Sequence, residues 1–311
     1  MHHIIRGDAA RIPLPDGSVD LVIGSPPYIK QRTYLENGRD LGIARDTAAW
    51  VAWMLGVTTE ALRVSRGLVL WVVAGSTKDR CYQPGPEGLL WEWRRRGGHC
   101  LRPCYWHRVG IPGSGGDQRY RSDIEYVLAF KRPGKLPYAR ATANGRPPKY
   151  GPGGAMSHRK KDGGRVAEIR VKTERQADGS LRRQVYNPPE IANPGNLIRT
   201  TNGGGNLGSK LAHENEAPYP VAVPEFFIAS HCPPGGLVLD PFGGSGTTAH
   251  AAANLGRHAI GMDLRQSQCL LARRRLRGVT QGMAFGESEW VGRKPLPGQT
   301  SFLDLAETHH G

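Results

Sequence analysis

The sequence has 311 residues, 38% of them hydrophobic, and 42 Lys and Arg against 27 Asp and Glu give it a formal net charge of +15. This length suits one large domain or two modest ones, and no apolar run is long enough for a membrane span or a signal-peptide core, which excludes membrane insertion and predicts a cytoplasmic protein. Five irregularly spaced cysteines exclude a disulfide framework, and the positive charge favours a polyanionic partner, most often nucleic acid.

Residues 1–132 read as alternating strands and helices, one half of a single catalytic domain. Apolar periodicity and β-rich runs predict, in chain order, a strand at 19–23, a helix at 46–64, a strand at 67–74, a helix at 87–97, and strands at 101–109 and 124–131. The run at 67–74 is apolar throughout, as expected for a strand with helices on both faces. Between the last two strands lies a glycine-rich basic loop, in which Arg119 and Arg121 are candidate DNA contacts.

The composition changes over residues 133–212, where Gly, Pro, Arg and Lys dominate and 15 Lys and Arg stand against 5 Asp and Glu. Strands are predicted at 166–172 and 181–186, joined as a hairpin. A disordered linker is the alternative, but 80 residues is long for a structureless connection within one domain. We therefore expect an inserted, partly ordered segment that faces nucleic acid, with Arg159, Lys160 and Lys161 as candidate DNA contacts.

Regular structure returns over residues 213–277, the predicted second half of the same domain, before a tail at 278–311 with little signal. The predicted elements are a helix at 223–232, a strand at 236–239, a glycine turn that opens a helix ending near Gly256, a strand at 258–264 and a helix at 266–276.

The stretch "LVLDPFGGSGTT" (residues 237–248) combines a strand, a glycine turn and a helix start, which together can bring backbone N–H groups close to a ligand. Asp240 ends this strand, and Asp263 ends the next one at a spacing that suits a ribose contact. A P-loop lysine is missing, which disfavours ATP, and the acid before the glycines would repel a pyrophosphate. The turn suits the cationic amino-acid end of S-adenosylmethionine; a tight turn without a ligand is the alternative.

Ser25, Pro26, Pro27 and Tyr28 follow the first predicted strand. Ligands of open α/β sheets bind beyond the carboxyl ends of the strands, so this tetrapeptide and the glycine turn are expected to share one crevice. The prolines remove two N–H donors and leave carbonyl acceptors. The Ser25 hydroxyl and the Pro26 carbonyl can bind the two N–H bonds of a nucleobase amine, while Tyr28 stacks on the extracted base.

These motifs resemble those of the amino-group DNA methyltransferases, which modify N4 of cytosine or N6 of adenine. The order of the motifs resembles the permuted class, in which the catalytic S-P-P-Y precedes the cofactor motif. The resemblance covers about residues 1–132 and 213–277 and implies a Rossmann-like α/β fold with a mainly parallel, seven-stranded sheet, helices on both faces, and a basic target-recognition insertion at 133–212.

The resemblance also implies the roles of individual residues. The catalytic set is Ser25, Pro26, Pro27 and Tyr28. The set for S-adenosylmethionine is Asp8, Asp240, Pro241, Phe242, Gly243, Gly244, Ser245, Gly246, Thr247 and Asp263. A leading serine is most often found in the cytosine-N4 enzymes, which favours that target. Double-stranded DNA is the implied partner, and a cognate restriction enzyme and the choice between monomer and homodimer stay open.

Four alternatives stand beside this hypothesis, one of which keeps the same chemistry but changes the substrate to RNA or a protein amine. Adenine N6 is the second target, and a catalytically inactive DNA-binding protein with the same fold is the alternative of another class. Methylation of cytosine C5 would need a cysteine nucleophile, and Cys104 follows a proline, but it lies within a predicted strand and is expected to be a packed thiol. The His and Cys residues between 99 and 107 lack a second paired cluster, so no metal site is expected.

Overall fold

In a computed structural model of the chain, the structure describes residues 2–29, 35–36, 39–40, 46–109, 120–148, 156–159, 161–168, 171–185, 189–201, 206–215 and 217–280. These residues fall into two compact units. The first unit combines Met1–Arg140 with Asn196–Gly311, and the second unit is Ala141–Gly195. Within the described ranges, none of the helices combines the length and the apolar character that a membrane crossing requires.

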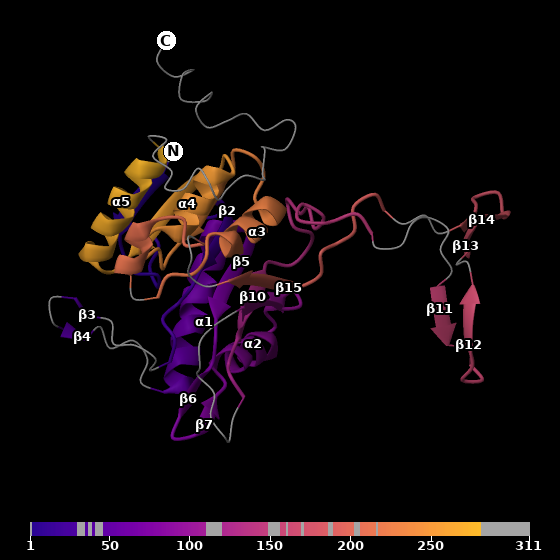
Figure 1. The fold of residues 1–311 in the computed structure, drawn as a ribbon, viewed down its shortest axis with the longest axis horizontal. Helices are drawn as coiled ribbons and strands as arrows, with labels where there is room; N and C mark the ends of the chain where they lie inside the picture. The colour runs from indigo at the N-terminus through magenta and orange to yellow at the C-terminus, as the bar shows by residue number, and fades with distance from the viewer. Residues whose placement is uncertain are drawn as a thin grey trace, which may run out of the picture. The chain divides into compact units, whose positions relative to one another are not determined.

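The first unit is built around one sheet (Figure 1). Its described strands, in the order in which they pair, are β1 (His2–Arg6), β17 (His258–Asp263), β16 (Leu237–Asp240), β2 (Val19–Gly24), β5 (Ser65–Val73), β10 (Ile124–Lys131), β9 (Cys104–Val109) and β15 (Leu197–Thr201), with β8 (His99–Cys100) also beside β10. The first five of these are parallel, whereas β10 runs antiparallel to both β5 and β9. The mainly parallel sheet is confirmed, but the described sheet has nine strands instead of the seven expected.

The centre of the sheet joins parts of the chain that are far apart in sequence. Strand β2 pairs with β16, and the Asp20 carboxylate accepts a hydrogen bond of 2.8 Å from the backbone N of Leu237. At the edge, β1 pairs with β17 so that Arg6 lies opposite Asp263. Strand β1 is not predicted by the sequence, because an edge strand with a single buried side chain, that of Ile4, carries almost no apolar signal.

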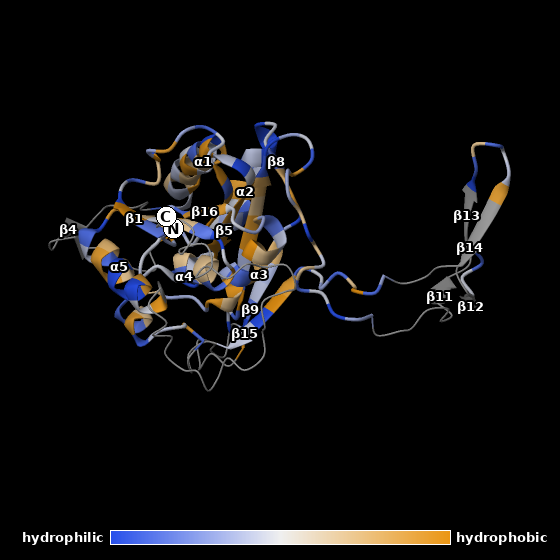
Figure 2. Cartoon of the chain, turned by 90° about the horizontal axis from the view of Figure 1, so that it is seen from above, coloured by the Kyte–Doolittle hydropathy of each residue, from blue (hydrophilic) through white to orange (hydrophobic). Residues whose placement is uncertain are grey.

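Helices cover both faces of the sheet, as predicted. They are α1 (Thr47–Val64), α2 (Gly85–Arg95), α3 (Ala222–His231), α4 (Thr247–Asn254) and α5 (Gln266–Thr280), with a short 3-10 helix η1 (Lys210–Glu214). Successive residues of β5 alternate between two apolar cores: Val69 and Trp71 pack with α1 and α2, while Leu68 and Leu70 pack with residues of α3, α4 and α5. Figure 2 shows α1 and α2 on one side of the strands and the other three helices on the opposite side.

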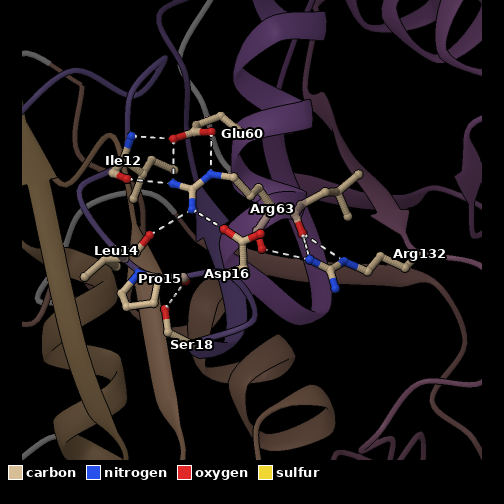
Figure 3. Close-up of polar contacts among 9 residues, drawn as sticks. Ile12, Leu14, Pro15, Asp16, Ser18, Glu60, Arg63 and Arg132 are labelled. Carbon is tan, nitrogen blue, oxygen red and sulfur yellow. Dashed lines mark hydrogen bonds and ion pairs between the residues drawn. The ribbon is translucent and has the colours of Figure 1, made fainter.

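The loop between β1 and β2 is fixed to the end of α1 by Arg63 (Figure 3). Its guanidinium donates to the carbonyl oxygens of Ile12 and Leu14 at 2.8 and 2.9 Å. The same group forms ion pairs with Asp16 at 2.6 Å and Glu60 at 2.8 Å. Helix α1 therefore holds the segment from Ile12 to Asp16, which follows Gly7 and Asp8 along the chain.

The second unit contains two short hairpins among its described residues. Strand β11 (Met156–Arg159) pairs with β12 (Arg165–Glu168), and β13 (Val171–Arg175) pairs with β14 (Leu181–Val185). The hairpin predicted across residues 176–180 is present, but a single strand at 166–172 is wrong, since β12 and β13 belong to different hairpins. The unit is also smaller than segment 133–212, because β15 pairs with β9 in the first unit.

The remaining described strands are short. They form two antiparallel pairs, β3 (Leu35–Glu36) with β4 (Arg39–Asp40), and β6 (Ser76–Lys78) with β7 (Cys81–Gln83).

Candidate active site

A cavity of about 300 Å³ in the first unit lies where the parallel strands end. Its walls include Ser25–Tyr28 directly after β2, Pro241–Gly244 directly after β16, Asp263 at the end of β17, and Gly7 and Asp8 directly after β1. The carboxyl ends of neighbouring parallel strands lie at the same edge of a sheet, which explains why these segments meet. The expected sharing of one crevice by the tetrapeptide and the glycine turn is therefore present.

The turn after β16 depends on glycine at specific positions. Gly244 and Gly246 have φ angles of +48° and +82°, a region that side chains with a Cβ rarely adopt. The turn is held by hydrogen bonds of 2.7 Å from the Gly243 N to the Met262 O and from the Gly246 N to the Gly243 O. Gly243, Gly244 and Thr247 line the cavity, whereas Ser245 and Gly246 do not.

Two carboxylates stand on the cavity wall where the cofactor acids were predicted. The Asp263 carboxylate accepts from the backbone N of Gly244 at 3.1 Å and of Arg265 at 2.9 Å, so it is fixed against the turn. The Asp8 carboxylate accepts from the backbone N of Ala10 at 2.9 Å. Each carboxylate has lone pairs left for a hydroxyl or amine of a ligand.

Asp240 was expected on the cavity wall with the cofactor-binding residues, but it lies in the core. It is 2% exposed and does not line the cavity. Its carboxylate accepts from the Phe242 backbone N at 2.9 Å and from the Thr248 hydroxyl at 2.5 Å, and burial raises its pKa to about 7. A Cβ at Gly24 would come within 2.5 Å of this carboxylate, so the two strand ends fit only because residue 24 is glycine. From its buried position, Asp240 stabilises the turn through these hydrogen bonds.

Aromatic side chains form another part of the wall. Phe242 lies edge-on to Trp53 and Trp71, with ring centroids 5.9 and 5.7 Å apart. Trp53 lines the cavity beside Phe242. From the sequence, Trp53 is only one of several apolar residues of a predicted helix, and nothing in the periodicity separates it from the core residues.

The backbone of the tetrapeptide is partly committed to the fold. The Trp50 indole N–H of α1 donates to the Pro27 carbonyl at 2.8 Å. In the described part of the chain, no group donates to the Pro26 carbonyl. Ser25 is half-buried and lines the cavity with both prolines. Ser25 and Pro26, which carry the acceptors predicted for a base amine, therefore lie at the cavity wall, and the Ser25 side chain also forms a hydrogen bond with that of Tyr28.

Tyr28 brings two further residues into the site. Its hydroxyl donates to the carboxylate of Glu125 on β10, and that carboxylate forms an ion pair of 3.1 Å with Arg108 on β9. All three line the cavity. Glu125 and Arg108 were not predicted as site residues. The signal that could have identified them is a charged residue inside a predicted strand.

Removal of the hydrogen bond between the Trp50 indole and the Pro27 carbonyl is expected to destabilise the protein. We expect Trp50→Phe to lower the free energy of unfolding by about 1–3 kcal/mol, since it removes the donor to Pro27 and some buried volume. Denaturant unfolding would measure this, with Trp91→Phe as the matched control because Trp91 is 72% exposed. Equal stability of Trp50→Phe and the wild type would show that the bond contributes nothing.

The predicted DNA contacts are only partly within the described structure. Arg119 and Lys160 lie outside the described residues. Arg121 lies 3.5 Å from Asp123, at an exposed position. In the second unit, Arg159 is the last residue of β11 and Lys161 is exposed.

The cysteines are free thiols, as expected. Cys104 is a half-buried residue of β9, and burial raises its pKa, which fits a packed thiol and disfavours a nucleophile. Among the residues that the structure describes, no cluster of His, Cys, Asp and Glu has an arrangement that could hold a metal ion.

Comparison with known proteins relates the chain to a family. The model of the family N6_N4_Mtase, described as DNA methylase, matches residues 19–274. The orphan methyltransferase M.BamHII of Bacillus amyloliquefaciens is 27% identical over 266 residues, which cover 84% of this chain and 90% of that protein.

Two solved structures show the same fold. The PvuII DNA methyltransferase (cytosine-N4-specific) matches with a TM-score of 0.63 and 18% identity, over 90% of each chain. The Thermus thermophilus protein TTHA0409, complexed with S-adenosyl-L-methionine, matches with a TM-score of 0.57 and 23% identity, over 91% of this chain and 96% of that one. The predicted fold class is thereby confirmed.

Proposed function

Because the chain belongs to the N6_N4_Mtase family of DNA methylases, we propose that it transfers a methyl group from S-adenosylmethionine to the exocyclic amine of a flipped-out base in double-stranded DNA. One observation carries the proposal: a single cavity is lined both by Ser25–Tyr28 and by the glycine turn after β16. The order of the motifs, with the tetrapeptide before the turn, supports a place in the permuted class as part of this proposal.

The residues around the turn fit S-adenosylmethionine. The acceptors of Asp263 and Asp8 suit its hydroxyl and amine groups, and the glycines leave room for close approach of a ligand to the backbone. Phe242 adds an apolar surface to the wall of the same cavity. When bound, S-adenosylmethionine supplies the electrophilic methyl group. The Thermus protein that was solved with this compound has the same fold, which supports the assignment.

The tetrapeptide suits the amine of a nucleobase. The nitrogen lone pair of such an amine is delocalised into the ring and is a weak nucleophile. Acceptors at Ser25 and at the Pro26 carbonyl would bind its N–H bonds and orient the lone pair, while the Tyr28 ring stacks on the base. The fixed φ angles of the prolines keep these acceptors in place before the base arrives.

We propose N4 of cytosine as the target in preference to N6 of adenine. The leading serine of the tetrapeptide, Ser25, supports this choice, and the cytosine-N4-specific PvuII enzyme shares the fold. Expression in a host without DNA methylation, followed by single-molecule sequencing, tests it. N4-methylcytosine in a fixed context is the expected result, N6-methyladenine would replace the target, and cofactor binding without any modified base would favour an inactive DNA-binding protein.

The basic segment 133–212 is proposed as the target-recognition region. We expect charge reversal at Arg159, Lys160 and Lys161 together to weaken DNA binding and to reduce the slope of log K against log salt by about 3, because each phosphate contact contributes about 0.9. Binding titrations at several salt concentrations would measure this slope. Unchanged binding would show that the cluster is only a solvated surface, and cofactor affinity serves as the internal control because the cofactor residues lie in the first unit.

A further inference from the structure

Glu125 is a buried carboxylate in the mainly apolar strand β10. It is 3% exposed, and its neighbours along β10 alternate into the two apolar cores from Val127 to Phe130. Burying a carboxylate costs free energy unless charge and hydrogen bonds compensate it. Here the compensation comes from the Arg108 guanidinium and the Tyr28 hydroxyl. Both partners, like Glu125 itself, belong to the cavity wall.

The Tyr28 hydroxyl keeps its proton at neutral pH. Burial, and after it the neighbouring Glu125, raises the pKa of Tyr28 well above its usual value. Contacts with Ser25 and Arg108 lower this pKa, but by less than burial and Glu125 raise it. The phenol therefore acts as the donor and the carboxylate as the acceptor. Burial likewise raises the pKa of Glu125, against the effect of Arg108.

The other parts of the tetrapeptide are already constrained by the backbone. Two consecutive prolines fix φ at residues 26 and 27, and Trp50 binds the Pro27 carbonyl at 2.8 Å. Neither the prolines nor the hydrogen bond from Trp50 fixes the side-chain torsions of Tyr28. A hydrogen bond from the ring's far end to a carboxylate that is itself fixed by an arginine removes this freedom.

We propose that Glu125, braced by Arg108, is a positioning residue that holds the Tyr28 ring in the orientation in which it receives the target base. Glu125 acts through Tyr28 and needs no contact with the base or the cofactor. The gain is preorganisation, since ordering the ring before the base arrives lowers the entropic cost of the productive complex. This inference rests on the proposed function, because it gives Tyr28 its role there.

A second glutamate of the chain makes a matched control. Glu87 on α2 also accepts hydrogen bonds from phenols, those of Tyr82 at 2.8 Å and Tyr126 at 2.9 Å, but it does not line the cavity. If a carboxylate–phenol bond mattered only for the fold, Glu125 and Glu87 would respond alike to substitution.

The test is a double-mutant cycle on the full-length protein with Tyr28→Phe and Glu125→Leu, alone and combined. We expect each single variant to lower the single-turnover rate of methyl transfer to duplex DNA by about 10- to 100-fold. A small misplacement of a reacting group causes a rate loss of this size. The double variant should be no slower than the slower single variant, and the dissociation constant of S-adenosylmethionine should stay within about twofold. Glu125→Gln, which retains an acceptor oxygen, should be faster than Glu125→Leu, and Glu87→Gln should match the wild type.

A second measurement does not depend on methyl transfer. It uses the NMR spectrum of protein in which tyrosine carries a ¹³C label at the ring carbon that bears the hydroxyl. The NMR signal of Tyr28 is identified by its loss in Tyr28→Phe. We expect Glu125→Leu or Glu125→Gln to shift or broaden this signal and Glu87→Gln to leave it unchanged. A Tyr28 signal indifferent to Glu125, or multiplicative rate losses in the double variant, would overturn the inference. Wild-type protein that methylates no DNA would overturn the proposed function instead, whatever this signal shows.

Discussion

Tyr28→Ala is expected to reduce methyl transfer about a hundredfold at saturating S-adenosylmethionine, since base–aromatic stacking contributes about 1–3 kcal/mol and the correct orientation of the amine is lost with it. Ser25→Ala should have an effect of similar size, because it removes one of the acceptors for the amine. Both substitutions should spare the affinity for the cofactor, whose proposed partners follow β1, β16 and β17.

Single-turnover assays with labelled S-adenosylmethionine would measure the rate, and calorimetry would measure the cofactor affinity. Trp91→Ala is the control for loss of an aromatic ring, because Trp91 is exposed on α2 and does not line the cavity. Wild-type turnover in Tyr28→Ala or Ser25→Ala would refute the roles assigned to the tetrapeptide.

Asp263→Ala should have the opposite profile, with a loss of cofactor affinity of about 10- to 100-fold, the value of one or two hydrogen bonds to a charged group. The variant removes an acceptor from the cavity wall and leaves the backbone N–H groups of Gly244 and Arg265 without their partner. At cofactor concentrations well above the new dissociation constant, most of the transfer rate should return, whereas it should not return in Tyr28→Ala.

The control for Asp263→Ala is Asp178→Ala in the second unit, where the carboxylate also accepts from a turn N–H, that of Ser180 at 2.9 Å. Calorimetric titration of S-adenosylmethionine into each variant would measure the affinity. Normal affinity in Asp263→Ala would mean that this acid shapes the turn without contributing to cofactor binding.

The sequence was most informative where the apolar pattern was strong. Strands β2, β5 and β10 and the helices on both faces follow from long apolar or periodic runs, because burial on two faces leaves little choice of residue type. Strands β1 and β15 escaped prediction because edge strands bury few side chains. The break between β12 and β13 also escaped, since the pattern alone does not say which strand pairs with which.

The candidate site also contains residues that the sequence predicted and residues that it did not. Apart from Asp8, which only the family resemblance indicated, motif spacing predicted the residues that line the cavity after β2 and β16 and at the end of β17, namely Ser25–Tyr28, the glycine turn and Asp263. It did not distinguish Asp240, an acid that supports the turn from inside the core, from Asp263, which reaches the wall. Nor did it pair Tyr28 with Glu125, since a contact between residues 97 positions apart becomes visible only when β2 and β10 are placed in the sheet.

The pairing of β2 with β16 bears on how the protein is made. Asp20 and Leu237 are 217 positions apart, so during synthesis β2 must wait for most of the chain before its neighbour exists. Until then a central apolar strand presents an open edge, the condition under which nascent chains associate wrongly. Contacts of such long sequence separation also fold slowly. The half-made chain, rather than the finished enzyme, is therefore the species most in need of a chaperone.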